Sequence, residues 1–124
     1  MDKKHLLLID DDGIMLQLFG GQFASAGYEV LYAHDGAEGW EMARSKKPDI
    51  ILCDFRMPNM DGLELGGRLK AAPETKDIPL VMLTSEDFSA DVQRALKDMG
   101  VADYLHKSLA FPEMLERVKK IVAP

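Results

Sequence analysis

Four short stretches of the sequence carry polar groups that could do chemistry together. Three consecutive aspartates, at 10–12, follow an apolar run, and Asp54 follows another. The hydroxyl pair Thr84-Ser85 and the cation Lys107 follow two further apolar runs. Carboxylates that meet at one site repel one another, so either their pKa values rise and one holds a proton, or a cation compensates them.

Carboxylate oxygens favour Mg²⁺, Ca²⁺ or Mn²⁺ over Zn²⁺ as the compensating ion. We select Mg²⁺, with Mn²⁺ as a substitute, because so few protein oxygens leave coordination positions for water and a phosphoryl group. A metal, a nucleophile, a lysine and a hydroxyl donor make up a phosphoryl-transfer site. Asp54 is the best nucleophile, because it stands alone at its strand end and a carboxylate can accept a phosphoryl group. Asp10 and Asp11 would then hold the ion.

The elements that must position these groups alternate along the chain, as is typical of βα units around a parallel sheet. We predict strands at 6–9, 29–33, 49–53, 80–83 and 102–105. We predict helices at 14–26, 37–45, 63–71, 90–99 and 112–122. In the common strand order 2-1-3-4-5, strands one and three are neighbours, and the acids that follow them meet where the connections diverge.

Length and charge exclude several classes of function. The chain has 124 residues and a formal net charge of −6, which predicts one domain over 1–124, with no output domain in this chain and no direct nucleic acid binding. Cys53 is the only cysteine, which excludes an internal disulfide. The apolar run at 6–9 is too short for a signal peptide or a membrane span, so we expect a cytoplasmic protein without membrane contact.

Taken in order, four segments resemble the receiver domain of two-component response regulators, and together they span essentially the whole chain. The resemblance implies a flavodoxin-like (βα)5 three-layer sandwich with a five-stranded parallel sheet of order 2-1-3-4-5, as in the chemotaxis response regulator. The segments are Leu6-Leu-Leu-Ile-Asp-Asp-Asp12, Pro48-Asp-Ile-Ile-Leu-Cys-Asp-Phe-Arg-Met-Pro-Asn-Met-Asp-Gly62, Ile78-Pro-Leu-Val-Met-Leu-Thr-Ser85 and Asp103-Tyr-Leu-His-Lys107.

The resemblance also assigns roles at the acidic cluster. Asp54 matches the phosphoacceptor, which takes a phosphoryl group from a phosphohistidine on a sensor histidine kinase or histidine phosphotransfer protein. Asp11 and Asp54 match direct Mg²⁺ ligands, and Asp10 matches an acid that reaches the metal through water. Arg56 matches the residue that supplies a backbone carbonyl to the metal. The chain would assist only its own phosphorylation and dephosphorylation, so we do not expect an ordinary enzyme.

Three further positions match the family's switch. Thr84 matches the switch hydroxyl, Lys107 the phosphate-pairing lysine and Tyr104 the aromatic switch residue. Phosphorylation adds charge and acceptor oxygens, and the switch would change the face formed by the fourth helix, fifth strand and fifth helix. That face would control a downstream protein target, or an output domain absent from this chain, and would also be the surface for dimerisation.

Other residues tune the site or depart from the family pattern. Arg56 and Glu86 match positions that tune the phosphoryl lifetime, and their opposite charges predict a pair across the site mouth. Ser85 is small enough to allow access. The family usually has a cis Lys-Pro bond after the fifth strand, whereas here Ser108 follows Lys107. A cis bond before a non-proline residue is costly, so the sequence leaves the cis and trans forms both open, and a trans loop is expected to displace Lys107.

Three alternatives follow from these observations. A displaced lysine would favour a pseudo-receiver, an interaction domain that keeps the acids without switching through phosphate. A chain that is phosphorylated without a change at its output face would be a phosphate relay or sink. A phosphatase of the haloacid dehalogenase type would require a second acid two residues after the nucleophile, and Arg56 occupies that position.

Several residues receive structural rather than chemical interpretations. Asp12 and Asp61 are expected to cap helices, and His5, His34 and His106 have no metal-ligand spacing. The pairs Gly20-Gly21 and Gly66-Gly67 lie inside predicted helices, where each glycine costs about 1 kcal/mol. We expect exposed positions there, or alternatively a surface for close approach of a partner helix, to which the apolar Leu16 would contribute.

Overall fold

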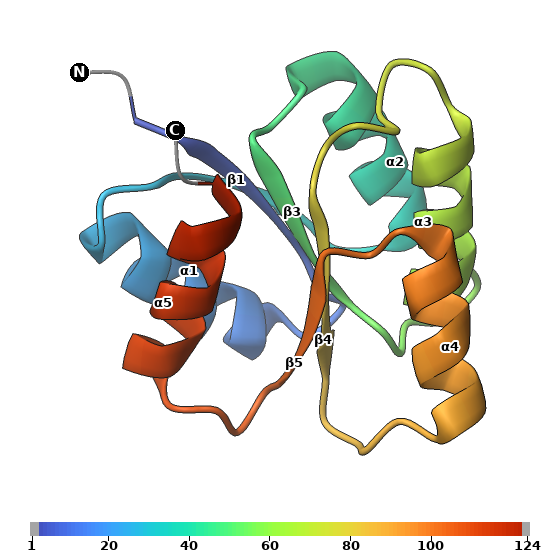
Figure 1. Cartoon of the computed structure of the whole chain (residues 1–124). Coiled ribbons are helices and arrows are strands. Elements are labelled where there is room, and N and C mark those ends of the chain that lie inside the picture. Colours follow the sequence, from blue (N-terminus) through green and yellow to red (C-terminus); the bar gives the residue numbers. More distant parts are fainter. Residues whose placement is uncertain (1–2, 123–124) are drawn as a thin grey trace.

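Strand and helix alternate strictly through ten elements in the computed structural model, which describes residues 3–122 (Figure 1). Every predicted element is present, and no end shifts by more than one residue. The strands are β1 (His5–Ile9), β2 (Glu29–Ala33), β3 (Ile50–Asp54), β4 (Leu80–Thr84) and β5 (Asp103–His106). The helices are α1 (Gly13–Ser25), α2 (Gly36–Lys46), α3 (Gly62–Ala71), α4 (Ala90–Met99) and α5 (Phe111–Val122).

The strands form one parallel sheet in the order β2-β1-β3-β4-β5, which confirms the predicted flavodoxin-like topology. All residues of β3 and β4 are buried, as consecutive apolar residues in a covered strand require. Both strands run one residue further than predicted, because Asp54 pairs with Leu83 and Thr84 pairs with His106. Asp54 and Thr84 are therefore held by the sheet itself rather than by the loops that follow.

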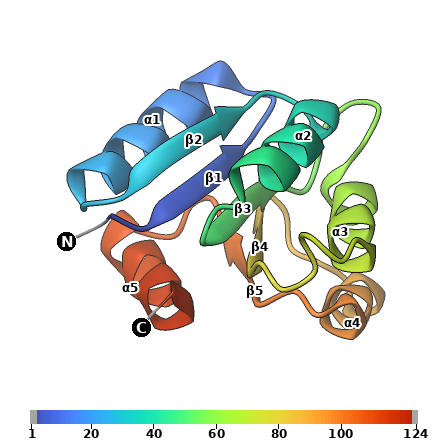
Figure 2. The ribbon, with the colours of Figure 1, turned by 90° about the horizontal axis from the view of Figure 1, so that it is seen from above.

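Helices cover both faces of the sheet. Viewed from above, α1 and α5 lie on one face, and α2, α3 and α4 lie on the other (Figure 2). Successive side chains of a strand point to opposite faces, so Leu6 and Leu8 of β1 join the hydrophobic cluster under α1 and α5. Leu7 and Ile9 join the second cluster, under the other three helices. The interior thus consists of two hydrophobic layers with the sheet between them.

Helix ends follow the predicted capping residues. The Asp12 carboxylate accepts a hydrogen bond from the Ile14 N–H at 2.9 Å, and Asp61 accepts one from the Glu64 N–H at 2.9 Å. Gly100 ends α4 in the left-handed conformation, at φ +89°, which favours glycine because it has no Cβ. Among residues 3–122, none of the helices is long and apolar enough to cross a membrane.

Gly20, Gly66 and Leu16 are buried, whereas the sequence predicted exposed positions or a partner surface there. At Gly20 and Gly66 the absence of a Cβ leaves room for a side chain from another element to pack against the helix. A Cβ on Gly20 would clash with the ring of Tyr32, and one on Gly66 would lie 3.1 Å from Cε of Met82. Leu16 is buried in the cluster under α1 and α5. The expectations of exposed glycines at these two positions and of a partner surface at Leu16 are therefore wrong, because side chains of other elements pack against all three residues.

Candidate functional site

The polar side chains gather where the connections leave the sheet in opposite directions. β1 and β3 are neighbours, and Ile9 pairs with Cys53, so Asp10, directly after β1, and Asp54, the last residue of β3, lie at the ends of adjacent strands. The chain continues from β1 to α1 on one face and from β3 to α3 on the other. Ligands of open α/β sheets bind in the crevice at such a switch point.

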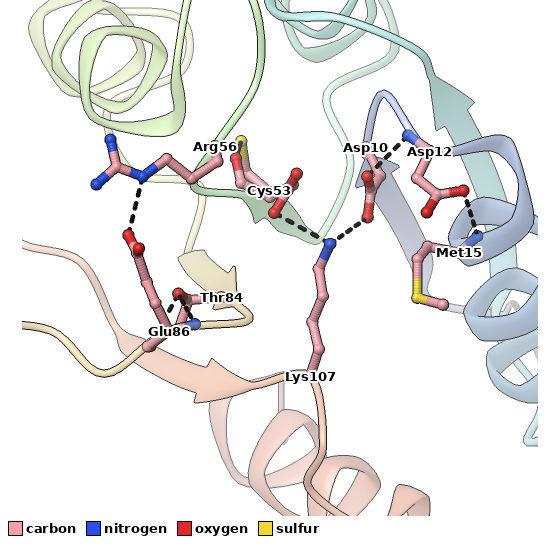
Figure 3. A network of polar contacts seen from close by, with 9 residues as sticks. Asp10, Asp12, Met15, Cys53, Arg56, Thr84, Glu86 and Lys107 are labelled. Carbon is pink, nitrogen blue, oxygen red and sulfur yellow. Dashed lines mark hydrogen bonds and ion pairs between the residues drawn. The ribbon is translucent and has the colours of Figure 1, made fainter.

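Lys107 joins the two buried acids. Its Nζ lies 2.9 Å from Oδ2 of Asp10 and 3.1 Å from Oδ1 of Asp54. Figure 3 shows the Lys107 side chain extended toward Asp10 from the far side of the crevice. The described residues contain no cis peptide bond, so the bond between Lys107 and Ser108 is trans. The expected displacement of Lys107 is nevertheless wrong, because the lysine reaches both carboxylates from a trans loop.

A third carboxylate lies next to this pair. One oxygen each from Asp10, Asp11 and Asp54 can be chosen so that all three lie within 4.8 Å of one another. Asp10 and Asp54 are buried, whereas Asp11 is exposed and opens the cluster to solvent. An all-oxygen donor set of this kind fits a hard divalent cation. The acids of the chain are therefore arranged so that they could hold a metal ion.

Burial shifts the proton affinities of the site. Burial, together with the negative charge of Asp10, raises the pKa of Asp54 to about 6, although Lys107 acts in the opposite direction. Burial alone would lower the pKa of Lys107, but the hydrogen bond to Asp10 and the charge of Asp54 outweigh it, and that pKa is raised. Burial also raises the pKa of the Cys53 thiol, so Cys53 remains an uncharged packing residue. Asp54 therefore gives up its proton less readily than an ordinary aspartate, whereas Lys107 holds its proton more firmly than an ordinary lysine.

The Thr84 hydroxyl is occupied by its own loop. It donates a hydrogen bond to the Glu86 carbonyl at 3.0 Å and accepts one from the Glu86 N–H at 3.0 Å. Thr84 is buried, whereas Ser85 is exposed beside the site. For the hydroxyl to reach a group on Asp54, the segment that follows β4 would have to exchange these two hydrogen bonds for a new one.

The predicted pair between Arg56 and Glu86 is present. Arg56 Nε lies 2.9 Å from Glu86 Oε1 across the mouth of the site. Both side chains are well exposed, with 71% and 45% of their surfaces accessible. Exposed ion pairs contribute little to stability, because solvent screens them. The contact therefore connects the segment after β3 to the segment after β4 without fixing either one.

Tyr104 lies at the surface and is 38% exposed. Its ring packs against Phe88, with centroids 5.5 Å apart, and Phe88 in turn packs against Phe55 at 4.6 Å. Phe88 follows β4, so its ring stands between the exposed tyrosine and the buried Phe55. An inward movement of Tyr104 would have to displace Phe88, a contact that the sequence pattern did not reveal.

Two further contacts at the site were missed at the sequence level. The N–H of Asp12 donates to Oδ1 of Asp10 at 2.9 Å and orients that carboxylate. Ser108 contacts the ring of His106, with its Oγ 2.7 Å from Nδ1. The position of His106 directly before Lys107, with serine in place of the family's proline after it, was the available signal. The spacing of the histidines did not indicate this contact, because spacing was considered only as evidence for a metal site.

The chain resembles known proteins along most of its length. Residues 6–119 match the family model of the response regulator receiver domain. The response regulator MprA of Mycobacterium ulcerans (strain Agy99) is 36% identical over 118 residues, which cover 95% of this chain and 50% of that protein. The chain therefore spans about half the length of the curated relatives it matches.

Solved structures give the same result for the fold. The Vibrio cholerae chemotaxis protein CheY4 has a TM-score of 0.90 and 28% identity, with 97% of this chain and 99% of that chain covered. The N-terminal domain of a response regulator receiver protein from Methanoculleus marisnigri JR1 has a TM-score of 0.81 and 28% identity, with 99% of each chain covered.

Proposed function

Because this chain belongs to the family of response regulator receiver domains, we propose that it is a signalling phosphoacceptor whose Asp54 takes a phosphoryl group from a phosphohistidine. The position of Asp54 carries the proposal. Its buried carboxylate lies close to two further acids, Asp10 and Asp11, and is 3.1 Å from the Lys107 ammonium group. A lone buried carboxylate would be costly, whereas here a cation and an ion site accompany it.

In the proposed reaction an oxygen of Asp54 forms a bond to phosphorus while the bond from phosphorus to the imidazole nitrogen breaks. The leaving nitrogen keeps the electron pair of that bond. Lys107 lies where it can pair with a phosphoryl oxygen, and in doing so it would give up a contact with Asp10 or Asp54. Asp10, Asp11, Asp54 and the backbone carbonyl of Arg56 would hold Mg²⁺, which neutralises charge on the transferring group when bound.

The phosphorylated state would bias the loops after β4 and β5. A phosphoryl group brings acceptor oxygens, which compete with Glu86 for the Thr84 hydroxyl. Withdrawal of Thr84 toward Asp54 would leave space for Tyr104, provided that Phe88 moves. The changed surface would be the α4-β5-α5 face, through which the chain would control a downstream protein or an output domain, or pair with a second copy. Equilibria of this kind shift only as far as the two states differ in their contacts.

The proposal predicts a simple change of mass. The chain is incubated with acetyl phosphate, with and without Mg²⁺, and its intact mass is measured. We expect the wild type to gain one phosphoryl group only in the presence of Mg²⁺, and Asp54→Asn to gain none. Asp12→Asn is the matched control, because Asp12 lies in the same acidic run but caps α1.

The outcomes separate the alternative functions. A wild-type chain that gains no phosphoryl group contradicts the proposal and leaves a pseudo-receiver that acts by binding alone. A chain that gains one without amide shift changes on the α4-β5-α5 face is a relay or sink. Full activity of Asp54→Asn would show that the phosphoryl group resides elsewhere.

A further inference from the structure

The turn that carries Lys107 is closed by backbone hydrogen bonds on both sides. The N–H of Leu109 donates to the carbonyl of His106 at 3.0 Å, so Lys107 and Ser108 occupy the two central positions of a turn. The N–H of Lys107 donates to the carbonyl of Thr84 at 2.7 Å. The start of the turn is thus tied to the sheet, while Ser108 lies on its outer side.

The imidazole of His106 contacts Ser108 on the outer side of the turn. The backbone N–H of Ser108 donates to Nδ1 of His106 at 3.1 Å, and Oγ of Ser108 lies 2.7 Å from the same nitrogen. A backbone N–H can only donate, so Nδ1 is the acceptor in this contact and can make it only without a proton of its own. Aspartate and asparagine side chains stabilise turns in the same way, by accepting from the N–H two residues further on.

Open space borders the turn on the side of α1. A cavity of about 370 Å³ is lined by Lys107, Ser108 and His106 together with Asp12, Met15 and Ser85. Because this space separates the turn from the start of α1, the turn could relax into it. Figure 3 shows the lysine crossing from the turn to Asp10, so a shift of the turn would move the ammonium group relative to both carboxylates.

We propose that His106 is a positioning residue for Lys107: its neutral ring, by accepting from Ser108, holds the trans turn in the conformation that brings the ammonium group to Asp10 and Asp54. The proposal rests on the proposed function, because the purpose of this placement is phosphoryl transfer. Ser108 stands where the family usually has proline, which has no N–H to donate. The contact between His106 and Ser108 therefore takes over the role of the cis bond in shaping this turn.

The proposal implies a dependence on pH. Imidazole side chains change charge between about pH 5 and 8, and a proton on Nδ1 would remove the acceptor for Ser108. Charged groups face His106 from two directions. Glu86 and Asp87 line one adjoining cavity, and Asp12 and Lys107 line the other. Acidification should therefore loosen the turn and slow the uptake of a phosphoryl group.

The test compares His106→Asn, which keeps an acceptor near the position of Nδ1, with His106→Phe, which keeps a ring without an acceptor. Rates of phosphorylation by acetyl phosphate with Mg²⁺ are measured between pH 5.5 and 8. At pH 7.5 we expect His106→Asn to match the wild type and His106→Phe to be about two- to tenfold slower, the range that one lost hydrogen bond gives. The ratio of the His106→Asn rate to the wild-type rate should rise as the pH falls, since the titration of Asp54 and of the donor is common to both. A ratio that stays flat, or equal rates for all three chains, overturns the inference.

A second measurement does not depend on phosphorylation. The amide shift of Ser108 is followed by NMR over the same pH range, without donor or metal. It should titrate in the wild type, stay constant in His106→Asn and lie at a different value in His106→Phe. A wild-type chain that never gains a phosphoryl group contradicts the proposed function, and the Ser108 shift then decides separately whether His106 holds the turn. A shift that does not titrate in the wild type overturns the inference on its own.

Discussion

At the scale of single residues, the site combines groups whose charges depend on one another. Asp54 is buried beside Asp10, and its pKa is raised to about 6 although Lys107 is only 3.1 Å away. The single positive charge of Lys107 therefore does not fully offset the negative charges of both Asp10 and Asp54. The site keeps an excess of negative charge, which a bound divalent cation would neutralise.

The raised pKa of Asp54 predicts a cost to stability that depends on pH. A carboxyl group whose pKa is higher in the folded chain than the ordinary 3.8 destabilises the fold when ionised. The cost is fully present above pH 6 and is lost as the pH falls toward 4. We expect Asp54→Asn, without Mg²⁺, to be about 1–2 kcal/mol more stable than the wild type at pH 7.5, with a clearly smaller gap at pH 4.5. Urea unfolding at both pH values measures it, and a variant less stable than the wild type at pH 7.5 would contradict it.

Asp11 and Asp12 offer a matched pair for the metal site. Asp11 belongs to the carboxylate cluster, whereas Asp12 accepts hydrogen bonds from the first turn of α1. Asn also caps helices well, so Asp12→Asn should leave Mg²⁺ affinity nearly unchanged. Asp11→Asn should weaken it by about tenfold or more, since changes even beyond the direct ligands reach that size. Calorimetric titration with Mg²⁺ distinguishes them, and equal losses in the two variants would refute a direct role for Asp11.

At the scale of elements, the apolar runs predicted the fold well because burial on both faces leaves a direct mark on sequence. The run at 50–53 is an example, since every residue of β3 is buried. The exact ends could not be predicted, because the pairing of Asp54 with Leu83 depends on the neighbouring strand. The settings of Gly20 and Gly66 were missed for a similar reason. The side chains that approach them come from other elements, Tyr32 of β2 for Gly20 and Met82 of β4 and Met99 of α4 for Gly66, and helical periodicity does not show such contacts.

In the candidate site, too, some features could be predicted from the sequence and others could not. Its acids and lysine were predictable, because parallel strands bring their carboxyl ends to one edge. The hydrogen bonds of Thr84 to Glu86 and of Ser108 to His106 were not, since they depend on the path of a turn. The predicted displacement of Lys107 was wrong because it considered the cis bond alone. A trans turn with a side-chain acceptor brings the lysine to the same acids.

The two glycines of α3 should respond differently to alanine. A Cβ on Gly67 would meet nothing within 4 Å, so Gly67→Ala should stabilise the chain by about 0.5–1 kcal/mol. A Cβ on Gly66 would lie 2.9 Å from Sδ of Met99 and 3.1 Å from Cε of Met82. Crowding should therefore cancel or reverse the gain from Gly66→Ala. Urea denaturation of both variants measures the difference, and equal gains would show that α3 can move away from β4.

At the scale of the whole molecule, the sheet separates two hydrophobic layers. Phe23 belongs to the layer under α1 and α5, where its ring contacts Phe111 with centroids 5.0 Å apart. Ile51 of β3 belongs to the other layer. Substitutions without shared partners usually add in their effects on unfolding free energy, whereas touching residues do not.

This arrangement predicts additivity across the sheet and coupling within a layer. Phe23→Leu combined with Ile51→Val should change the free energy of unfolding by the sum of the single effects, within about 0.5 kcal/mol. Phe23→Leu combined with Phe111→Leu should deviate from the sum by more than that. Double-mutant cycles by urea denaturation test both statements. Strong coupling between Phe23 and Ile51 would mean that the sheet transmits packing changes from one face to the other.

The separation of the layers also bears on how such a chain can evolve. If each layer tolerates its own substitutions, the α1 and α5 side can diverge while the α2, α3 and α4 side stays the same, and the reverse holds equally. Substitutions are restricted at the edge of the sheet where both layers meet. There Lys107 reaches from the segment before α5 to Asp54 on β3 and to Asp10 next to β1. Two independently variable surfaces attached to one constant reaction site would let related chains acquire new recognition properties without renewing their chemistry.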